Sequence, residues 1–164
     1  MNIVLLEPEI PHNTGAIGRT CHATGSTLHL IRPLGFSLDE RAIRRSGLDY
    51  WKDLDVRTYD NFEHFQRENP NARLFMATTK ARLAYTDVVY RADDYFVFGR
   101  ESKGLPEELL LQYPDSAIRI PMLAEMRSLN LSVSAGIILY EALRQTGFAQ
   151  LETKGQLHRH TWGE

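Results

Sequence analysis

Three polar stretches of the sequence carry residues that could bind a ligand or do chemistry. The first contains Asn13 and Arg19, the second Glu101, and the third Ser128 and Asn130. A guanidinium can bind phosphate or stabilise a developing negative charge, and carboxylate and amide groups can orient it through hydrogen bonds. Each residue also has a structural alternative. Ser128 or Asn130 could cap the helix that follows, Arg19 could form a surface ion pair, and Glu101 could remain solvated. The residue types alone leave these alternatives open.

Glycines accompany the first two stretches. Gly15 and Gly18 fall within a predicted helix, where each costs about 1 kcal/mol relative to alanine, so close approach of a backbone or a ligand would explain them. Gly99 directly follows a predicted strand, and Gly104 permits a left-handed turn before the next helix. The second stretch lacks the Gly-Lys-Ser/Thr ending of a P-loop, and no G-x-G-x-x-G occurs in the chain. The two common phosphate-binding fingerprints are therefore excluded.

Other chemistry finds weaker support. The six histidines are scattered without a metal-binding spacing, so we expect no metal. The single Cys21 falls on the apolar side of a predicted helix, which favours a packed thiol over a catalytic one. Arg41, Arg44 and Arg45 share one side of another predicted helix. They form either a solvated face or a patch that binds RNA phosphates.

Bulk properties limit the class of protein. The 164 residues suit one domain, and 43% hydrophobic with 24% charged residues is ordinary for a globular protein. A net charge of −2 argues against binding nucleic acid through overall charge alone, although a local basic patch remains compatible. One cysteine excludes an internal disulfide and fits a reducing compartment. The first ten residues predict neither a signal peptide nor a membrane span. We therefore expect a cytoplasmic protein with no membrane association.

Predicted strands and helices alternate along the chain, which indicates a single α/β domain with a mostly parallel sheet flanked by helices. In such sheets ligands bind beyond the carboxyl ends of the strands, where all three polar stretches fall. The domain is expected to span residues 1–150, and 151–164 to form a tail that is either frayed or a mobile basic arm. The expected strands are 2–6, 27–31, 55–58, 74–78, 95–98 and 118–120; the expected helices are 13–24, 37–46, 61–68, 106–112 and about four turns ending before residue 147.

The last predicted helix is apolar on more than one side, so we expect it to be buried on more than one side. Two stripes run along it: Leu131, Ala135, Ile138 and Ala142 form the first, and Val133, Ile137 and Tyr140 form the second.

In their order along the chain, the three stretches resemble the motifs of the SPOUT class of S-adenosylmethionine-dependent RNA methyltransferases. The matching segments are NTG at 13–15 with Arg19, FGRESKGLP at 98–106, and IPM at 120–122 followed by RSLNLS at 127–132. The start NIVLLEPEIPHNTG, GLDYW at 47–51 and TTK at 78–80 are most similar to the branch that methylates the wobble nucleotide of tRNA. The resemblance covers residues 1–147.

This resemblance implies a C-terminal trefoil knot, a homodimer, S-adenosylmethionine as cofactor and tRNA as partner. It places the cofactor against Ala77, Gly99, Ile120, Ser128 and Leu129. The family's catalytic and substrate positions fall on Asn13, Arg19, Glu101, Ser128 and Asn130. The chain departs from many relatives at His12, Arg100 and Leu129, which bears on the substrate rather than on the chemistry.

The implied reaction is 2′-O-methylation of the ribose of nucleotide 34 of tRNA, a cytidine or a modified uridine. The alternatives are methylation of another tRNA or rRNA site, and a non-catalytic RNA-binding protein of the same fold. In relatives the arginine corresponding to Arg19 is often proposed as the base. Because a guanidinium has a pKa above about 12, Arg19 is better suited to stabilising the developing alkoxide or holding a phosphate.

Overall fold

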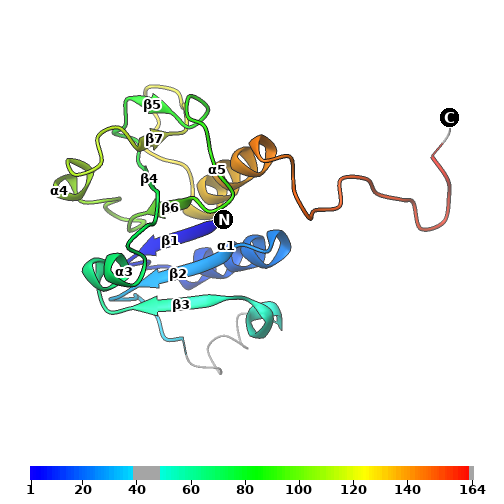
Figure 1. Ribbon diagram of the computed structural model, residues 1–164, viewed down its shortest axis with the longest axis horizontal. Coiled ribbons are helices and arrows are strands. Elements are labelled where there is room, and N and C mark those ends of the chain that lie inside the picture. The colour runs from blue at the N-terminus through cyan, green and yellow to red at the C-terminus, as the bar shows by residue number, and fades with distance from the viewer. Residues whose placement is uncertain (39–48, 163–164) are drawn as a thin grey trace.

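The computed structural model describes residues 1–38 and 49–162, and within them the chain forms one parallel sheet of seven strands (Figure 1). The strand order is β3-β2-β1-β6-β4-β7-β5. The predicted α/β fold with a parallel sheet is therefore confirmed. The strands are β1 Asn2–Leu6, β2 Thr27–Ile31, β3 Val56–Tyr59, β4 Leu74–Ala77, β5 Leu83–Ala84, β6 Tyr95–Phe98 and β7 Ala117–Arg119. The helices are α1 Pro11–Thr24, α3 Phe62–Glu68, α4 Glu107–Leu110 and α5 Leu131–Gln145, with a 3₁₀ turn η1 at Asp49–Asp53.

Most expected elements lie within a residue or two of their predicted bounds. The expected start of the first helix at Asn13 is wrong, because α1 already begins at Pro11. Proline suits the first turn of a helix, where its missing N–H has no intrahelical acceptor to lose. The helix expected at 106–112 is shorter than predicted, and β5 and η1 were not predicted. The helix expected at 37–46 lies mostly outside the described residues.

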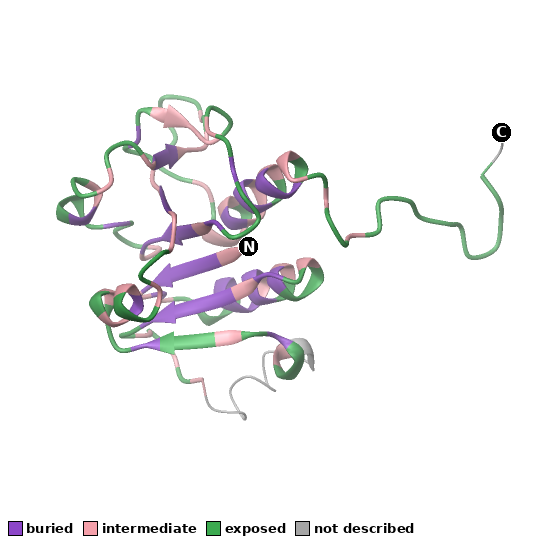
Figure 2. Ribbon diagram, viewed as in Figure 1, coloured by how far each residue is buried: buried purple, intermediate pink, exposed green. Residues whose placement is uncertain are grey.

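The core lies on both faces of the sheet, because successive side chains of a strand point to opposite sides. Ile3 and Leu5 of β1 pack with Ile17 of α1 and Ile138 of α5 on one face. Val4 of β1 packs on the other face, in the cluster that includes the α3 and α4 side chains. Figure 2 shows the central strands almost entirely buried between these layers. The layers hold the carboxyl ends of the strands in fixed positions.

Among the residues that the structure describes, one of the two apolar stripes of helix α5 is buried and the other is half-exposed. Ala135, Ile138 and Ala142 are buried, whereas Val133 is 50% and Tyr140 is 48% exposed. The expectation that α5 is buried on a second side is therefore not met within one chain. The second stripe remains available for a partner.

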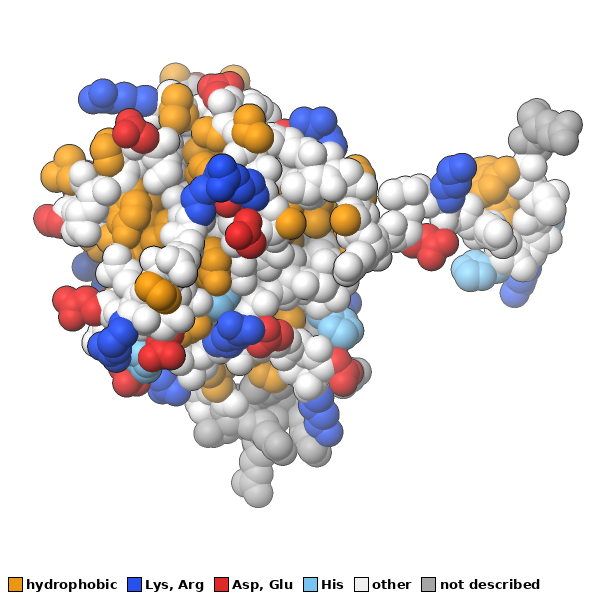
Figure 3. All heavy atoms as spheres, viewed as in Figure 1, with side chains coloured by type: hydrophobic (Ala, Val, Ile, Leu, Met, Phe, Trp, Pro, Cys, Tyr) orange, Lys and Arg blue, Asp and Glu red, His pale blue; other side chains and the backbone are white. Residues whose placement is uncertain are grey.

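Residues 151–162 are extended and almost fully exposed, and they stand apart from the body of the domain (Figure 3). In the described part of the chain, no helix has the length and apolar character that crossing a membrane requires.

Candidate active site

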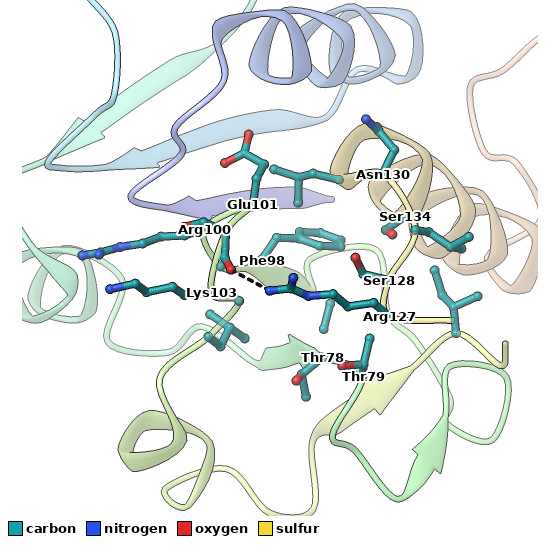
Figure 4. Close-up of a pocket in the computed structure, with 18 of the residues that line it drawn as sticks. Thr78, Thr79, Phe98, Arg100, Glu101, Lys103, Arg127, Ser128, Asn130 and Ser134 are labelled. Atoms are coloured by element: carbon teal, nitrogen blue, oxygen red, sulfur yellow. Dashed lines mark hydrogen bonds between the residues drawn. The ribbon is translucent and has the colours of Figure 1, made fainter. Parts of the chain in front are cut away.

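A cavity of about 720 Å³ opens at the carboxyl ends of β4, β6 and β7 (Figure 4). The residue that ends β4 (Ala77), the residue that ends β6 (Phe98) and Ile118 of β7 contribute to its wall. The segments 98–105 and 127–131 form the rest of the lining, together with Ile10 and Asn13 from the start of α1. All three polar stretches therefore meet at one cavity, as the parallel sheet led us to expect.

The residues expected to contact a cofactor lie together around this cavity. Ala77, Gly99, Ile120, Ser128 and Leu129 all line it, although they come from four separate segments of the chain. Four of the five expected catalytic or substrate residues also line it, namely Asn13, Glu101, Ser128 and Asn130. Their functional roles remain predictions.

A chain of hydrogen bonds connects the three polar stretches. The Glu101 carboxylate accepts a hydrogen bond from the side-chain amide of Asn13 at 3.1 Å. The Asn13 side-chain oxygen in turn accepts one from the Asn130 amide, also at 3.1 Å, across 117 residues of sequence. Two further donors reach Glu101 from the backbone of the first stretch, the N–H of Glu9 at 2.8 Å and that of Ile10 at 3.2 Å. The site is thus a continuous polar network.

Asn130 fulfils both of the roles that its sequence position left open. Its side-chain oxygen caps α5 by accepting hydrogen bonds from the N–H groups of Ser132 at 2.9 Å and Val133 at 3.3 Å. Because this oxygen faces the helix, the amide nitrogen must face Asn13. Capping therefore sets the direction of the whole network, since Asn13 then has only its own amide to offer Glu101.

Arg19 lies apart from the other predicted catalytic residues. It is exposed on α1 and is not among the residues that line the cavity. Arg41, Arg44 and Arg45, the proposed RNA-binding patch, lie outside the described residues. The single chain therefore brings together the amide and carboxylate groups of the site, but not its expected guanidinium.

Gly99 and Gly104 build the turn that carries Glu101. A Cβ at Gly99 would overlap the backbone of Gly104 and Leu105, and Gly104 has a positive φ of 70°. The Gly104 N–H closes the turn by donating to the carbonyl of Arg100 at 2.7 Å. Gly18 has a different explanation: a Cβ there would lie 3.1 Å from Leu54 and 3.2 Å from Trp51. Side-chain packing, rather than a ligand, accounts for Gly18.

Sequence reasoning missed several residues of the cavity. Arg127 stretches along it, and its guanidinium donates to the Ser102 carbonyl at 3.4 Å (Figure 4). Ser134 and Ile138 also reach the lining from α5, although Ile138 was assigned only to the core. Thr78 and Lys80 belong to the TTK segment that carries part of the resemblance, but they were not assigned to the site. Their position just after β4 points to the site by the rule that ligands bind beyond strand ends.

Charged groups surround the cavity mouth. Lys80 forms an ion pair with Glu107 at 2.6 Å, and Arg100 pairs with Glu7. Lys103 is exposed near the same rim. In the described residues, no group of three or more His, Cys, Asp and Glu side chains could hold a metal ion.

Cys21 belongs to the core and not to the site. It is fully buried, and this burial raises the pKa of its thiol to about 12. The thiolate, which is the reactive form, is therefore negligible near neutral pH.

The fold and the cavity define a parallel α/β protein that binds a cofactor-sized ligand beyond the carboxyl ends of its strands. Residues 1–140 match the SpoU rRNA Methylase family, and the chain belongs to that family. The family-level prediction from the three motifs is thereby confirmed.

Individual relatives agree with this assignment. A tRNA (cytidine(34)-2′-O)-methyltransferase from Saccharophagus degradans is 49% identical over 149 residues, which cover 90% of this chain and 97% of that protein. A solved structure described as "Structural insights into the 2-OH methylation of C/U34 on tRNA" has a TM-score of 0.83 and 44% identity, covering 89% of this chain and 95% of its own. An AdoMet-bound rRNA methyltransferase from Sinorhizobium meliloti has a TM-score of 0.75 and 25% identity, covering 87% of this chain and 55% of its own.

Proposed function

We propose that this protein transfers a methyl group from S-adenosylmethionine to the ribose 2′-hydroxyl of nucleotide 34 in tRNA, a cytidine or a modified uridine. One observation carries the proposal. The Glu101–Asn13–Asn130 network borders a cofactor-sized cavity in a chain that is 49% identical to a tRNA (cytidine(34)-2′-O)-methyltransferase over 90% of its length.

The cavity suits S-adenosylmethionine. Its volume of about 720 Å³ falls in the range of about 300–1,000 Å³ that is common for small-molecule sites. Apolar side chains such as Phe98, Leu105 and Ile138 offer walls for a purine, and the segment at Gly99 exposes backbone groups to it. When bound, the cofactor supplies a methyl group on a cationic sulfonium, which an oxygen nucleophile can displace without a metal.

The polar network would hold the substrate ribose. A carboxylate offers about four acceptor positions. Glu101 uses three of them for Glu9, Ile10 and Asn13, so one remains for a donor from the substrate or from a partner arginine. Because Asn13 is anchored by Asn130 as well, the groups that face the substrate are aligned before it binds. Such positioning alone can contribute several kcal/mol to catalysis.

Arg19 completes the site in this proposal from the partner subunit of a homodimer. The half-exposed apolar stripe of α5, with Val133, Ile137 and Tyr140, supports a second copy as its occupant. Ile10, 44% exposed at the edge of the cavity, adds to this surface. Arg19 of the partner subunit would stabilise the alkoxide that develops on the 2′-oxygen or hold the adjacent phosphate.

We also propose that the C-terminal part of the chain is threaded as a trefoil knot. The support is the position of α5 relative to segments far from it in sequence. Asn130 at its start contacts Asn13, while Gln145 at its end bonds the backbone of Val88 at 3.1 Å and Tyr90 at 3.0 Å.

The reaction is tested by incubating the protein with labelled S-adenosylmethionine and unmodified tRNA transcripts, followed by mapping of the labelled nucleotide. We expect label on nucleotide 34, and none when that nucleotide carries a 2′-deoxyribose. Label on a base nitrogen, or on ribosomal RNA only, would refute the proposed substrate.

The shared site is tested by mixing two inactive variants. In the proposal, each site combines Asn130 of one subunit with Arg19 of the other. A mixed dimer of an Arg19→Ala subunit and an Asn130→Ala subunit therefore contains one site with both residues intact and one site that lacks both. Each mixed dimer should regain up to about half of the wild-type rate. Mass measurement in solution, with Tyr140→Asp to disrupt the interface, checks the oligomer. A monomeric wild-type protein with full activity would contradict the homodimer, as would mixtures that show no recovery despite subunit exchange.

A further inference from the structure

Two glutamates from distant segments each accept hydrogen bonds from the segment that carries the other. The Glu101 carboxylate accepts the N–H groups of Glu9 at 2.8 Å and Ile10 at 3.2 Å. In return, the Glu9 carboxylate accepts the N–H of Ser102 at 2.9 Å and its hydroxyl at 2.8 Å. The four hydrogen bonds join the segment after β1 to the segment after β6, about 90 residues later.

The backbone of Glu9 is itself held from a third direction. A Cβ on Gly35 would lie 2.6 Å from the Glu9 carbonyl oxygen, and the Gly35 N–H donates to the carbonyl of Pro8 at 2.9 Å. The neighbouring Glu7–Arg100 ion pair links the same two segments a second time. Glu9 therefore presents its carboxylate to Ser102 from a rigid support.

We infer that Glu9 is a positioning residue for the methyl transfer, which acts through Glu101. This inference rests on the proposed function. By holding the peptide and hydroxyl of Ser102, Glu9 fixes the rotation of the 101–102 segment, and the Glu101 side chain stays turned toward Asn13. Figure 4 shows Glu101 directed toward the segment between β1 and α1, whereas Arg100 and Lys103 point elsewhere.

The charge of Glu9 suits this role. Hydrogen bonds from the Ser102 hydroxyl and then its N–H lower the pKa of the Glu9 carboxyl, assisted by the nearby charge of Lys103. Glu9 is thus an ionised acceptor across the neutral range, and charged acceptors form the stronger hydrogen bonds. Glutamine at this position keeps one oxygen acceptor and loses the second, whereas alanine loses both.

The test measures kcat and KM for Glu9→Ala, Glu9→Gln, Glu101→Gln and the double variant Glu9→Ala/Glu101→Gln. We expect Glu9→Ala to lower kcat roughly tenfold to a hundredfold, a range typical of small misplacements in an active site, while KM for S-adenosylmethionine stays within about twofold. The kcat of Glu9→Gln should lie between those of the wild type and Glu9→Ala. When Glu101→Gln is already present, adding Glu9→Ala should lower kcat by less than a further factor of about two. The reason is that the effects of substitutions at residues that act as a unit are not additive. Glu108→Gln, an exposed carboxylate on α4, is the matched control and should keep wild-type kinetics.

Amide hydrogen exchange gives a readout that does not depend on activity. Glu9→Ala should speed exchange at Ile10, whose N–H donates to Glu101 and not to Glu9. Multiplicative losses in the double variant, unchanged exchange at Ile10, or a higher KM with unchanged kcat would each overturn the inference. A wild-type protein that does not methylate tRNA would refute the proposed function, and the exchange experiment would still decide whether Glu9 orients Glu101. If Glu9→Ala does not fold, the same kinetic and exchange measurements are made with Glu9→Gln.

Discussion

Replacing Asn130 by aspartate separates its two roles, because aspartate can accept hydrogen bonds from α5 but cannot donate to Asn13. Asparagine and aspartate are about equally good N-caps, and the helix dipole favours a negative charge there. We therefore expect Asn130→Asp to keep the part of the stability that the cap contributes. Asn130→Ala removes the acceptor of the Ser132 and Val133 N–H groups and should cost about 1–2 kcal/mol. For a domain of this size that corresponds to a Tm lower by about 2–8 °C.

The activity of Asn130→Asp should fall even though its cap is kept. In Asn130→Asp the Asn13 side-chain oxygen loses its donor and faces a carboxylate instead. An unsatisfied group of this kind costs about 1–3 kcal/mol, and about 1.4 kcal/mol corresponds to a factor of ten in rate. Because the Asn13–Asn130 hydrogen bond aligns the groups of the site, we expect its loss to lower kcat roughly tenfold to a hundredfold.

The assays are thermal unfolding and single-turnover methyl transfer at saturating cofactor and tRNA, with Ser132→Ala as a control that leaves the acceptor of the cap in place. Full kcat in a stably folded Asn130→Asp protein would refute the role of the Asn13–Asn130 hydrogen bond. An Asn130→Asp protein as unstable as Asn130→Ala would refute the assignment of the cap.

Three other predictions follow from the same structure. Gly99→Ala should abolish detectable S-adenosylmethionine binding by calorimetry, because the added Cβ overlaps the backbone of Gly104 and Leu105; unchanged affinity would contradict the close-packed turn. Burial lowers the pKa of His29 from 6.5 to about 4, so its contribution to stability is present above pH 6.5 and is lost as the pH falls toward 4, with a slope of up to about 1.4 kcal/mol per pH unit. Measured by urea unfolding between pH 7 and 4, the free energy of unfolding of His29→Gln should depend less steeply on pH than that of the wild type. An identical pH dependence in the two proteins would exclude His29 as its source. Cys21 should resist alkylation in the folded protein at pH 8 and react once it is unfolded in urea, since burial raises its pKa to about 12; rapid labelling of the native protein would show that it is accessible.

Local patterns predicted the elements well where apolar runs are bounded by clear breaks. β1, β2 and β6 match their predicted bounds, because each is a short buried strand whose side chains nearly all face the core. β5 escaped prediction since its two residues pair with β7 only through the tertiary arrangement and carry no periodic signal. The expected start of α1 was two residues late, because Pro11 already occupies the first turn of the helix.

The candidate site was only partly accessible to the same reasoning. Motifs in the sequence identified Asn13, Glu101, Ser128 and Asn130, and the parallel sheet explains why they meet. Nothing local indicated that Glu9 would bind Ser102. That contact requires the ends of β1 and β6 to be neighbours, which the strand order decides.

The sequence by itself determined the α/β class, the family and the residues of three polar stretches, because side-chain periodicity, turn-forming glycines and ordered motifs are local properties of the chain. Only the tertiary structure decided how those residues act together. It showed that Asn130 is both a cap and a link to Asn13, that Arg19 lies away from the cavity, and that Gly18 makes room for Trp51. The physical reason is that hydrogen bonds and packing between residues up to 117 positions apart depend on the order of the strands, which no local pattern specifies.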